Sequence, residues 1–467
     1  MQRNDIVKGV FVVVPLTVAF MLYGLWLVMD TPVYMESMIV AGIVLMLASV
    51  LFLRFLPRAF DFVMGADQTA ALSTVRRTSI IGGRELIRLV FLLILGRGLF
   101  MLGAFLWSLK LKGYTETVFD IQHIWADHMY AARVISLANK GYGLQVQEAG
   151  GRYLNLLFPP VYSFFVRLIS PMYLSSIRAA FYLSNLNAIL SGVVLYLLVL
   201  HDSDRKSAVR ALWFYTILPP SFLLTCTVPA STFMLLSLLS VYLARRRRFV
   251  PSAVVGCLAA LTDRAGIALM APLLLEFFPA MTEEYRSLKE VTWRFYLNKG
   301  LVGASIALVP LGFILYLVIN REVGGSLFTY AEYLEDLFDS RFALFYRVSG
   351  ALTEKLVDAY RTFDRAMLFG VCLPNLIAAV GSLGLMLLVD KQMRVSYLAY
   401  FMVSYLLIFS RTGVLDGPRQ LFCCFPVILS LVYLAKKGRL LTWVLSLLSI
   451  GGLAIYLGMY VAGWPVA

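Results

Sequence analysis

Two carboxylates and one imidazole occur at helical spacing in the segment that follows the third apolar stretch. Asp120, His123 and Asp127 stand at positions i, i+3 and i+7. If the segment is helical up to Lys140, as the Gly-rich stop after it indicates, all three side chains lie on one helix face. A half-buried carboxylate can act as a general base that removes the proton of a hydroxyl. Asp127 and Asp120 are therefore the candidate catalytic residues.

Each of these residues also has a simpler interpretation. Asp127 fits a helix salt bridge, for example to Arg133, and His123 fits a histidine packed at the membrane interface. Together with Asp120 they have donors for a divalent cation, but carboxylate and histidine spacing on one helix is a weak indication of a metal site. We expect no metal and no other cofactor.

The composition predicts that lipid covers much of the chain. Of its 467 residues, 60% are hydrophobic and 15% are charged, and the mean hydropathy is +0.80. A soluble domain carries roughly 25% charged residues, so this chain has too little polar surface for a water-soluble globule. The formal net charge of +14 lies largely in short loops between apolar stretches, where Lys and Arg set topology and do not indicate nucleic-acid binding. The five cysteines lie in or beside apolar stretches without a CxxC pair, which favours buried thiols over disulfides or metal ligands.

The apolar stretches predict an all-α polytopic membrane protein with about 13 transmembrane helices. The expected spans are 10–28, 38–56, 89–109, 179–200, 211–225, 230–244, 250–262, 265–279, 299–319, 365–389, 395–410, 419–435 and 440–461. The four between 211 and 279 are short, and they cross only if the bilayer thins or flanking residues snorkel. The stretch 153–170 starts near Pro159-Pro160 and contains Arg167, so we expect a half-entering or surface-lying helix there.

The positions of the basic residues predict the orientation. Lys and Arg collect in the loops 57–88, 201–210, 245–248, 280–298, 390–394 and 436–439, which are therefore expected to be cytoplasmic. The N-terminus is then inside and the C-terminus outside. Charges at membrane depth are expensive and usually face a cavity or a partner. We expect one polar cavity at the outer face to hold Asp120, Asp127, Asp263, Arg264, Arg411, Asp416 and Arg419.

Four short motifs resemble those of the GT-C glycosyltransferases, which include protein O-mannosyltransferases, aminoarabinose transferases and GPI mannosyltransferases. The segment Trp125 to Tyr130 resembles their acidic element after the first core helix, and Phe158-Pro159-Pro160-Val161-Tyr162 resembles their Pro-Pro-Leu-Tyr element. The stretch Leu261 to Gly266 resembles their Leu-Thr-Lys/Arg-x-x-Gly turn, and Gly417-Pro418-Arg419 resembles a late Pro-Arg-Tyr stretch. The resemblance covers about 89–435, and His128 replaces the second acidic residue of the first motif.

The resemblance implies a hexosyl- or pentosyltransferase that uses a polyprenyl-phosphate sugar as its donor. The acceptor, on a lipid, glycan or protein, would lose its hydroxyl proton to Asp127 and attack the anomeric carbon with inversion. Arginine suits the leaving lipid phosphate because its planar fork gives paired hydrogen bonds. The implied substrate- and phosphate-binding residues are Arg419, Arg264, Arg411, His128 and Tyr130. For the arginines, the alternative is contact with lipid headgroups or helix ends.

The remaining expectations concern the domains, the location and two competing functions. We expect an N-terminal unit 1–88, a GT-C-like core 89–435 with outer loops 110–178 and 320–364, and a C-terminal helix within 436–467. The short loops favour a bacterial cytoplasmic membrane with the site facing outside. The aromatic residues of 320–364 indicate an interfacial helix, or else a simple aromatic belt. Four arginines in that loop keep an O-antigen-type polymerase possible, and a lipid-linked sugar flippase is the other alternative: Arg321, Arg341, Arg347 and Arg361.

Overall fold

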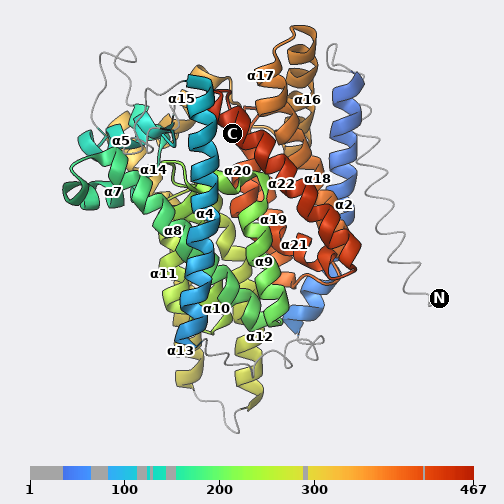
Figure 1. The fold of residues 1–467 in the computed structure, drawn as a ribbon. Coiled ribbons are helices and arrows are strands. Elements are labelled where there is room, and N and C mark those ends of the chain that lie inside the picture. The colour runs from blue at the N-terminus through green and yellow to red at the C-terminus, as the bar shows by residue number, and fades with distance from the viewer. Residues whose placement is uncertain are drawn as a thin grey trace.

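The structure, a computed structural model, describes residues 35–64, 82–112, 124–126, 130–142, 154–287, 293–413 and 416–466. Within these ranges the protein is built from helices, and β pairing is limited to one isolated bridge between Phe342 and Arg411. Figure 1 shows the long helices packed side by side, with shorter ones between them.

The elements fall into three groups. The longest helices are α2 (Met35–Met64), α4 (Gly83–Lys112), α8 (Ser176–Asp202) and α22 (Arg439–Val461). Shorter segments of the bundle are α9 (Arg205–Ile217), η3 (Pro219–Leu224), α10 (Ala230–Arg245), α11 (Phe249–Ala260), η4 (Arg264–Leu269), α12 (Met270–Ser287), α13 (Trp293–Ser305), α14 (Leu308–Gly324), η5 (Leu368–Cys372), α18 (Leu373–Val389), α19 (Val395–Ile408), α20 (Gly417–Cys423) and α21 (Pro426–Ala435). One end carries α5 (Tyr130–Lys140), η2 (Leu154–Leu157), α7 (Pro160–Tyr173), α15 (Thr329–Phe338), α16 (Phe345–Arg361) and α17 (Arg365–Met367).

The helices identify a multi-pass integral membrane protein, as predicted. Six helical segments of the described chain are long and apolar enough to cross a membrane, and two bent helix pairs raise the number to eight. Three more apolar helices, α10, α11 and α19, are shorter. The all-α polytopic class is thus confirmed. The number of 13 crossings stays a prediction, and the expected span 10–28 lies outside the described residues.

The predicted basic loops gather at one end of the bundle, which we call the basic-loop end. Here Arg205 Nε lies 3.1 Å from Glu85 Oε1, which joins the start of α9 to the start of α4. Lys436 Nζ lies 3.7 Å from Asp204 Oδ1, which joins the end of α21 to the same place. The loops were assigned to one face from charge alone, and these ion pairs show that they do share an end.

Three short helices start or finish at the basic-loop end and stop well below the opposite end. α11 has 12 residues, α19 has 14 and α10 has 16, whereas α8 has 27. At 1.5 Å per residue, α11 is about 18 Å long and α8 about 40 Å. A bilayer core is about 30 Å thick. The short helices are therefore shorter than a bilayer core is thick, which agrees with the short apolar stretches between 211 and 279.

The stretch 153–170 forms a short helix that does not cross. α7 begins at Pro160, whose fixed φ suits the first turn, and ends at Leu174 in the left-handed conformation with φ 54°. Its Val161, Tyr162 and Val166 are buried, and it packs against α5 and α8. With 14 residues it is about 21 Å long and is not among the candidate spans. This agrees with the expectation that this stretch does not cross the membrane fully.

The orientation predicts which exposed positions a membrane-impermeant thiol reagent reaches. Arg341 and Arg205 have matched side-chain exposures of 69% and 68%, on opposite ends of the bundle. In a chain without its native cysteines, Arg341→Cys is expected to be labelled from outside intact cells, and Arg205→Cys only after lysis. The reverse pattern would invert the orientation and place the polar turns on the cytoplasmic side.

Candidate functional site

Five of the residues that were expected to share a cavity do come together. Asp263 and Arg264 lie in the turn between α11 and η4, Arg411 follows α19, and Asp416 and Arg419 lie at the start of α20. Asp263 is within electrostatic reach of Arg264, Asp416 and Arg419, and Arg264 is within reach of Arg411. We call this set the arginine cluster. It combines three guanidinium groups with two carboxylates at the far ends of short helices.

The turn from Leu261 to Gly266 is shaped by its aspartate and its glycine. The Ala265 N–H donates to Asp263 Oδ1 over 2.9 Å, and the Gly266 N–H donates to the Asp263 carbonyl over 2.9 Å. A Cβ on Gly266 would lie 2.4 Å from the backbone nitrogen of Ala260, closer than any side chain tolerates. This part of the motif thus holds a tight turn, and it leaves Arg264 as its functional side chain.

Arg264 has unused hydrogen-bonding capacity. Its guanidinium lies over the ring of Tyr330, 5.5 Å from the ring centre, and makes no hydrogen bond or ion pair with any residue in the described ranges. Tyr330 is held by the buried Asn320, whose Oδ1 accepts the Tyr330 N–H over 3.0 Å. The aromatic face orients the guanidinium, and its N–H donors remain open to an anionic ligand.

Arg419 and Asp416 form an ion pair at the start of α20. Asp416 also accepts a hydrogen bond from Gln420 Nε2 over 2.8 Å, and Arg419 is 14% exposed. Burial raises the pKa of Asp416, but the charge of Arg419 and the Gln420 hydrogen bond outweigh it, so the net shift is downward. Burial also raises the pKa of Asp263, and this effect outweighs the lowering by the Ala265 N–H and by the charge of Arg264.

Arg411 is mainly engaged in holding the chain. Its Nε donates to Ser340 Oγ over 3.1 Å, and its terminal nitrogens donate to the Ala331 carbonyl over 3.1 Å and to the Ser340 carbonyl. These bonds fasten the 320–364 segment to the end of α19. Burial, followed by the charge of Arg264, lowers the pKa of Arg411. Arg411 thus has fewer donors left than Arg264 among the described residues.

The sequence-based candidates did not include Arg97, which lies in the interior of α4. Its side chain is 5% exposed, and it donates to Thr225 Oγ1 over 2.9 Å and to Tyr215 Oη over 3.4 Å. The Tyr215 ring stacks on Phe422 with ring centres 5.8 Å apart, so one tyrosine connects Arg97 to α20, the helix that carries Arg419. The sequence did contain an indication of its importance, because Arg97 is the single arginine within the apolar stretch 89–109.

Several predicted residues fall outside the part of the chain that the structure describes. Asp120, His123, Asp127 and His128 are among them, and Tyr130 is described only as the first backbone position of α5. Their roles, and the expectation that they bind no metal, stay predictions. α5 ends at Lys140 as expected, with Gly141 at φ +67°.

The expected helix does not run unbroken through the segment, because Ile124, Trp125 and Ala126 form a turn before α5 begins. Trp125 is 0% exposed, and its carbonyl accepts the Thr227 N–H over 3.1 Å. This bond ties the segment to the turn between η3 and α10. The helix that was expected to run up to Lys140 is therefore interrupted at 124–126, while Asp120, His123 and Asp127 lie outside the described residues.

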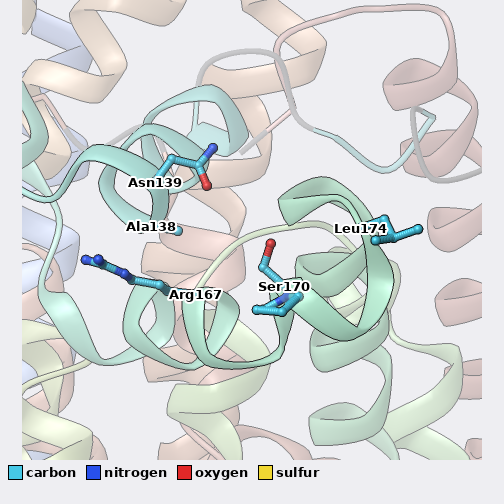
Figure 2. A pocket seen from close by; sticks show the side chains of 6 residues that line it. Ala138, Asn139, Arg167, Ser170 and Leu174 are labelled. Carbon is cyan, nitrogen blue, oxygen red and sulfur yellow. The ribbon is translucent and has the colours of Figure 1, made fainter.

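A separate surface hollow lies between α5 and α7, as Figure 2 shows. Its volume is about 340 Å³, and its lining comprises Ala138, Asn139, Arg167, Ser170, Pro171 and Leu174. Arg264, Arg411 and Arg419, the predicted site residues whose side chains the structure describes, do not line it. The candidate site is therefore the arginine cluster and its surroundings, and not this hollow.

Comparison with known proteins gave structural matches only. No family model and no curated protein sequence matches this chain. ArnT from Cupriavidus metallidurans in the apo state is similar at a TM-score of 0.40 and 12% identity, over 72% of this chain and 70% of its own. The oligosaccharyltransferase of Archaeoglobus fulgidus, tethered to an acceptor peptide, is similar at 0.39 and 11%, over 79% of this chain and 55% of its own. The AglB protein of the same organism, in complex with an inhibitory peptide and a dolichol-phosphate, is similar at 0.36 and 12%, over 79% and 56%.

This chain thus spans little more than half the length of the two archaeal proteins.

Proposed function

We propose that this protein is a membrane glycosyltransferase that moves a sugar from a polyprenyl-phosphate donor to an acceptor hydroxyl, with inversion at the anomeric carbon. The observation that carries the proposal is the open guanidinium of Arg264 beside Arg419, at membrane depth. A lipid-linked phosphate has the matching chemistry, because its charge needs cationic partners while its tail stays in lipid. The four GT-C-like motifs support the same class.

The phosphate would be held by Arg264 and Arg419. Both can present paired N–H donors to phosphate oxygens. Arg419 stays oriented by its ion pair with Asp416, and Arg264 by the face of Tyr330. As the sugar–phosphate bond breaks, negative charge grows on the leaving phosphate, so these arginines stabilise the transition state more than the bound donor. Arg411, with most of its donors used by the chain, holds the wall of the site.

Asp127 is the proposed base. It takes the proton of the acceptor hydroxyl while the hydroxyl oxygen attacks the anomeric carbon, and the bond from that carbon to the phosphate oxygen breaks. The polyprenyl phosphate leaves with the bonding electrons. Trp125, two residues earlier, is bound to the turn that carries Thr225 and Thr227, beside the arginine cluster. His128 and Tyr130 are proposed to contact the substrate from the same segment.

The arginines of the 320–364 segment decide between this function and a polymerase. Arg321, Arg341, Arg347 and Arg361 are all exposed, and none of them belongs to the arginine cluster. Arg341 forms ion pairs of 3.4 Å with Glu335 and Asp339 at the surface. A polymerase that depends on this loop would need them directed at a site, so their placement favours the glycosyltransferase.

Substitution of Arg264 tests the proposed function. Arg264→Gln is expected to weaken binding of a geranyl phosphate probe about 10- to 100-fold, the usual effect of losing hydrogen bonds to a charged group. Arg264→Lys should recover only part of the loss, since a point charge does not reproduce the fork. Arg341→Gln is the matched control and should leave binding and turnover unchanged. Normal binding in Arg264→Gln, together with lost function in Arg341→Gln, would replace this proposal with the polymerase.

A further inference from the structure

Arg97 is a buried charge without a counter-ion. It stands near the middle of the candidate span Gly83–Lys110 and is 5% exposed. Its hydrogen-bond partners are two neutral hydroxyls, Thr225 Oγ1 at 2.9 Å and Tyr215 Oη at 3.4 Å. No carboxylate of the described chain pairs with it, and its Nε has no partner. Charged residues in membrane helices usually pair with one another or face a substrate path.

The other strongly buried arginines of this protein show what a structural arginine looks like here. Arg245 pairs with Asp202 at 2.6 Å and with Glu276 at 3.0 Å. Arg394 pairs with the other oxygen of Glu276 at 2.6 Å. Burying a charge without such a partner is strongly unfavourable. Arg97 departs from this pattern, so its charge calls for an anion that the described residues do not supply.

The surroundings of Arg97 carry further hydrogen-bond donors without partners. Trp125 Nε1, Thr227 Oγ1 and Ser231 Oγ are fully buried and make no hydrogen bond. Thr227 lies on the same turn as Thr225, the partner of Arg97, and Ser231 lies in the first turn of α10, directly after it. The Thr227 N–H donates to the Trp125 carbonyl over 3.1 Å. Buried polar atoms are rarely left unsatisfied, and each such atom requires an explanation. Here the unsatisfied groups belong to Trp125 and to the segment that follows Thr225, the partner of Arg97.

We propose that Arg97, Trp125, Thr227 and Ser231 form a second oxyanion site, which takes a phosphate group carried by a membrane-borne substrate. A phosphate supplies the missing negative charge and has enough acceptor oxygens for all four side chains. The site is separated from the arginine cluster by Tyr215 and Phe422, which stack with ring centres 5.8 Å apart. It includes the turn to which Trp125 is bound. That the bound molecule is a substrate rests on the proposed function, whereas the binding of a phosphate group does not.

Titration calorimetry with geranyl phosphate and dodecyl phosphate tests this site, with dodecanol as the uncharged control. Wild-type protein is expected to bind two equivalents of phosphate probe and none of dodecanol at the arginine sites. Arg97→Met should lose one equivalent, or bind it about 10- to 100-fold more weakly, while Arg264→Met loses the other. Loss of geranyl phosphate alone identifies the prenyl carrier of the donor as the ligand. Loss of both probes identifies a phosphate borne by other lipids, such as an acceptor. Arg88→Met, an exposed position on the same helix, is the matched control.

Thermal unfolding without probe separates a binding role from a structural one. Removing an uncompensated buried charge should leave the melting temperature of Arg97→Met unchanged or higher, because Tyr215 Oη still donates to the Ala188 carbonyl over 2.6 Å. Arg245→Met, which breaks paired charges, should melt lower. A lower melting temperature for Arg97→Met, or an unchanged binding stoichiometry, would overturn the proposal. Because binding and stability are measured without turnover, failure of the glycosyltransferase assignment would not produce either result.

Discussion

Asp127→Asn is expected to lower turnover by about 100- to 10,000-fold, the usual contribution of a positioned general base, while the donor lipid still binds. Asparagine keeps the size and hydrogen bonding of aspartate but cannot accept the proton of the acceptor hydroxyl. The measurement is sugar transfer from a defined polyprenyl-phosphate donor, alongside binding of a donor analogue.

Two variants accompany this measurement. Asp120→Asn, seven residues earlier, tests whether the second candidate carboxylate shares the role of base. Arg419→Ala should weaken donor binding and also slow the chemical step, because the charge that it meets grows as the bond to phosphate breaks. If Asp127→Asn kept near-normal turnover, the segment would not be catalytic, and a polymerase or flippase would become the better explanation.

Glu276→Gln is expected to lower the free energy of unfolding by about 3–5 kcal/mol, the usual cost of breaking a buried ion pair by removing one partner. The Glu276 side chain is 6% exposed and accepts from Arg245 Nη1 over 3.0 Å and from Arg394 Nε over 2.6 Å. Ser396 donates to the same carboxylate. Neutralising Glu276 leaves two buried guanidinium groups facing one another without the carboxylate between them. The contact between α10, α12 and α19 is therefore weakened.

A surface pair on the same side of the molecule provides the control. Arg247 and Glu283 form an ion pair with exposures of 44% and 45%, and such pairs contribute about 0–1 kcal/mol. Chemical unfolding of purified protein in detergent should therefore separate Glu276→Gln from Glu283→Gln clearly. Equal stability of the two variants would mean that the buried network does not hold the basic-loop end together.

Charge and length patterns alone predicted a large part of this fold. The basic loops were grouped correctly because positive residues collect on one face of a membrane protein, and the pairs Arg205–Glu85 and Lys436–Asp204 now join them. The same alternation of inner and outer loops predicted that Arg419 lies with Asp263 and Arg264, although about 155 residues of chain separate it from them. Such patterns identify the end of the bundle at which a residue lies.

What the patterns could not predict is which partner each side chain finds. Arg411 and Arg264 looked alike in the sequence, yet Arg411 is bound by Ser340 and Ala331 while Arg264 meets only the face of Tyr330. Those partners come from segments about 70 to 80 residues away. The sequence did not single out Arg97, because the stretch 89–109 around it is otherwise apolar. That no described carboxylate pairs with Arg97 becomes visible only once its neighbours in the structure are known. The interrupting turn at Ile124–Ala126 likewise depends on the contact of Trp125 with Thr227.

The short helices α10, α11 and α19 have a consequence for competing reactions. Because they stop inside the bilayer, the sugar–phosphate bond would be broken some distance below the aqueous surface, where few water molecules are available to attack the anomeric carbon. An activated sugar held there is protected from loss by hydrolysis until an acceptor hydroxyl arrives. Polar molecules dissolved in the surrounding fluid would also reach such a place poorly, whereas molecules that partition into the membrane would reach it sideways, through the lipid itself.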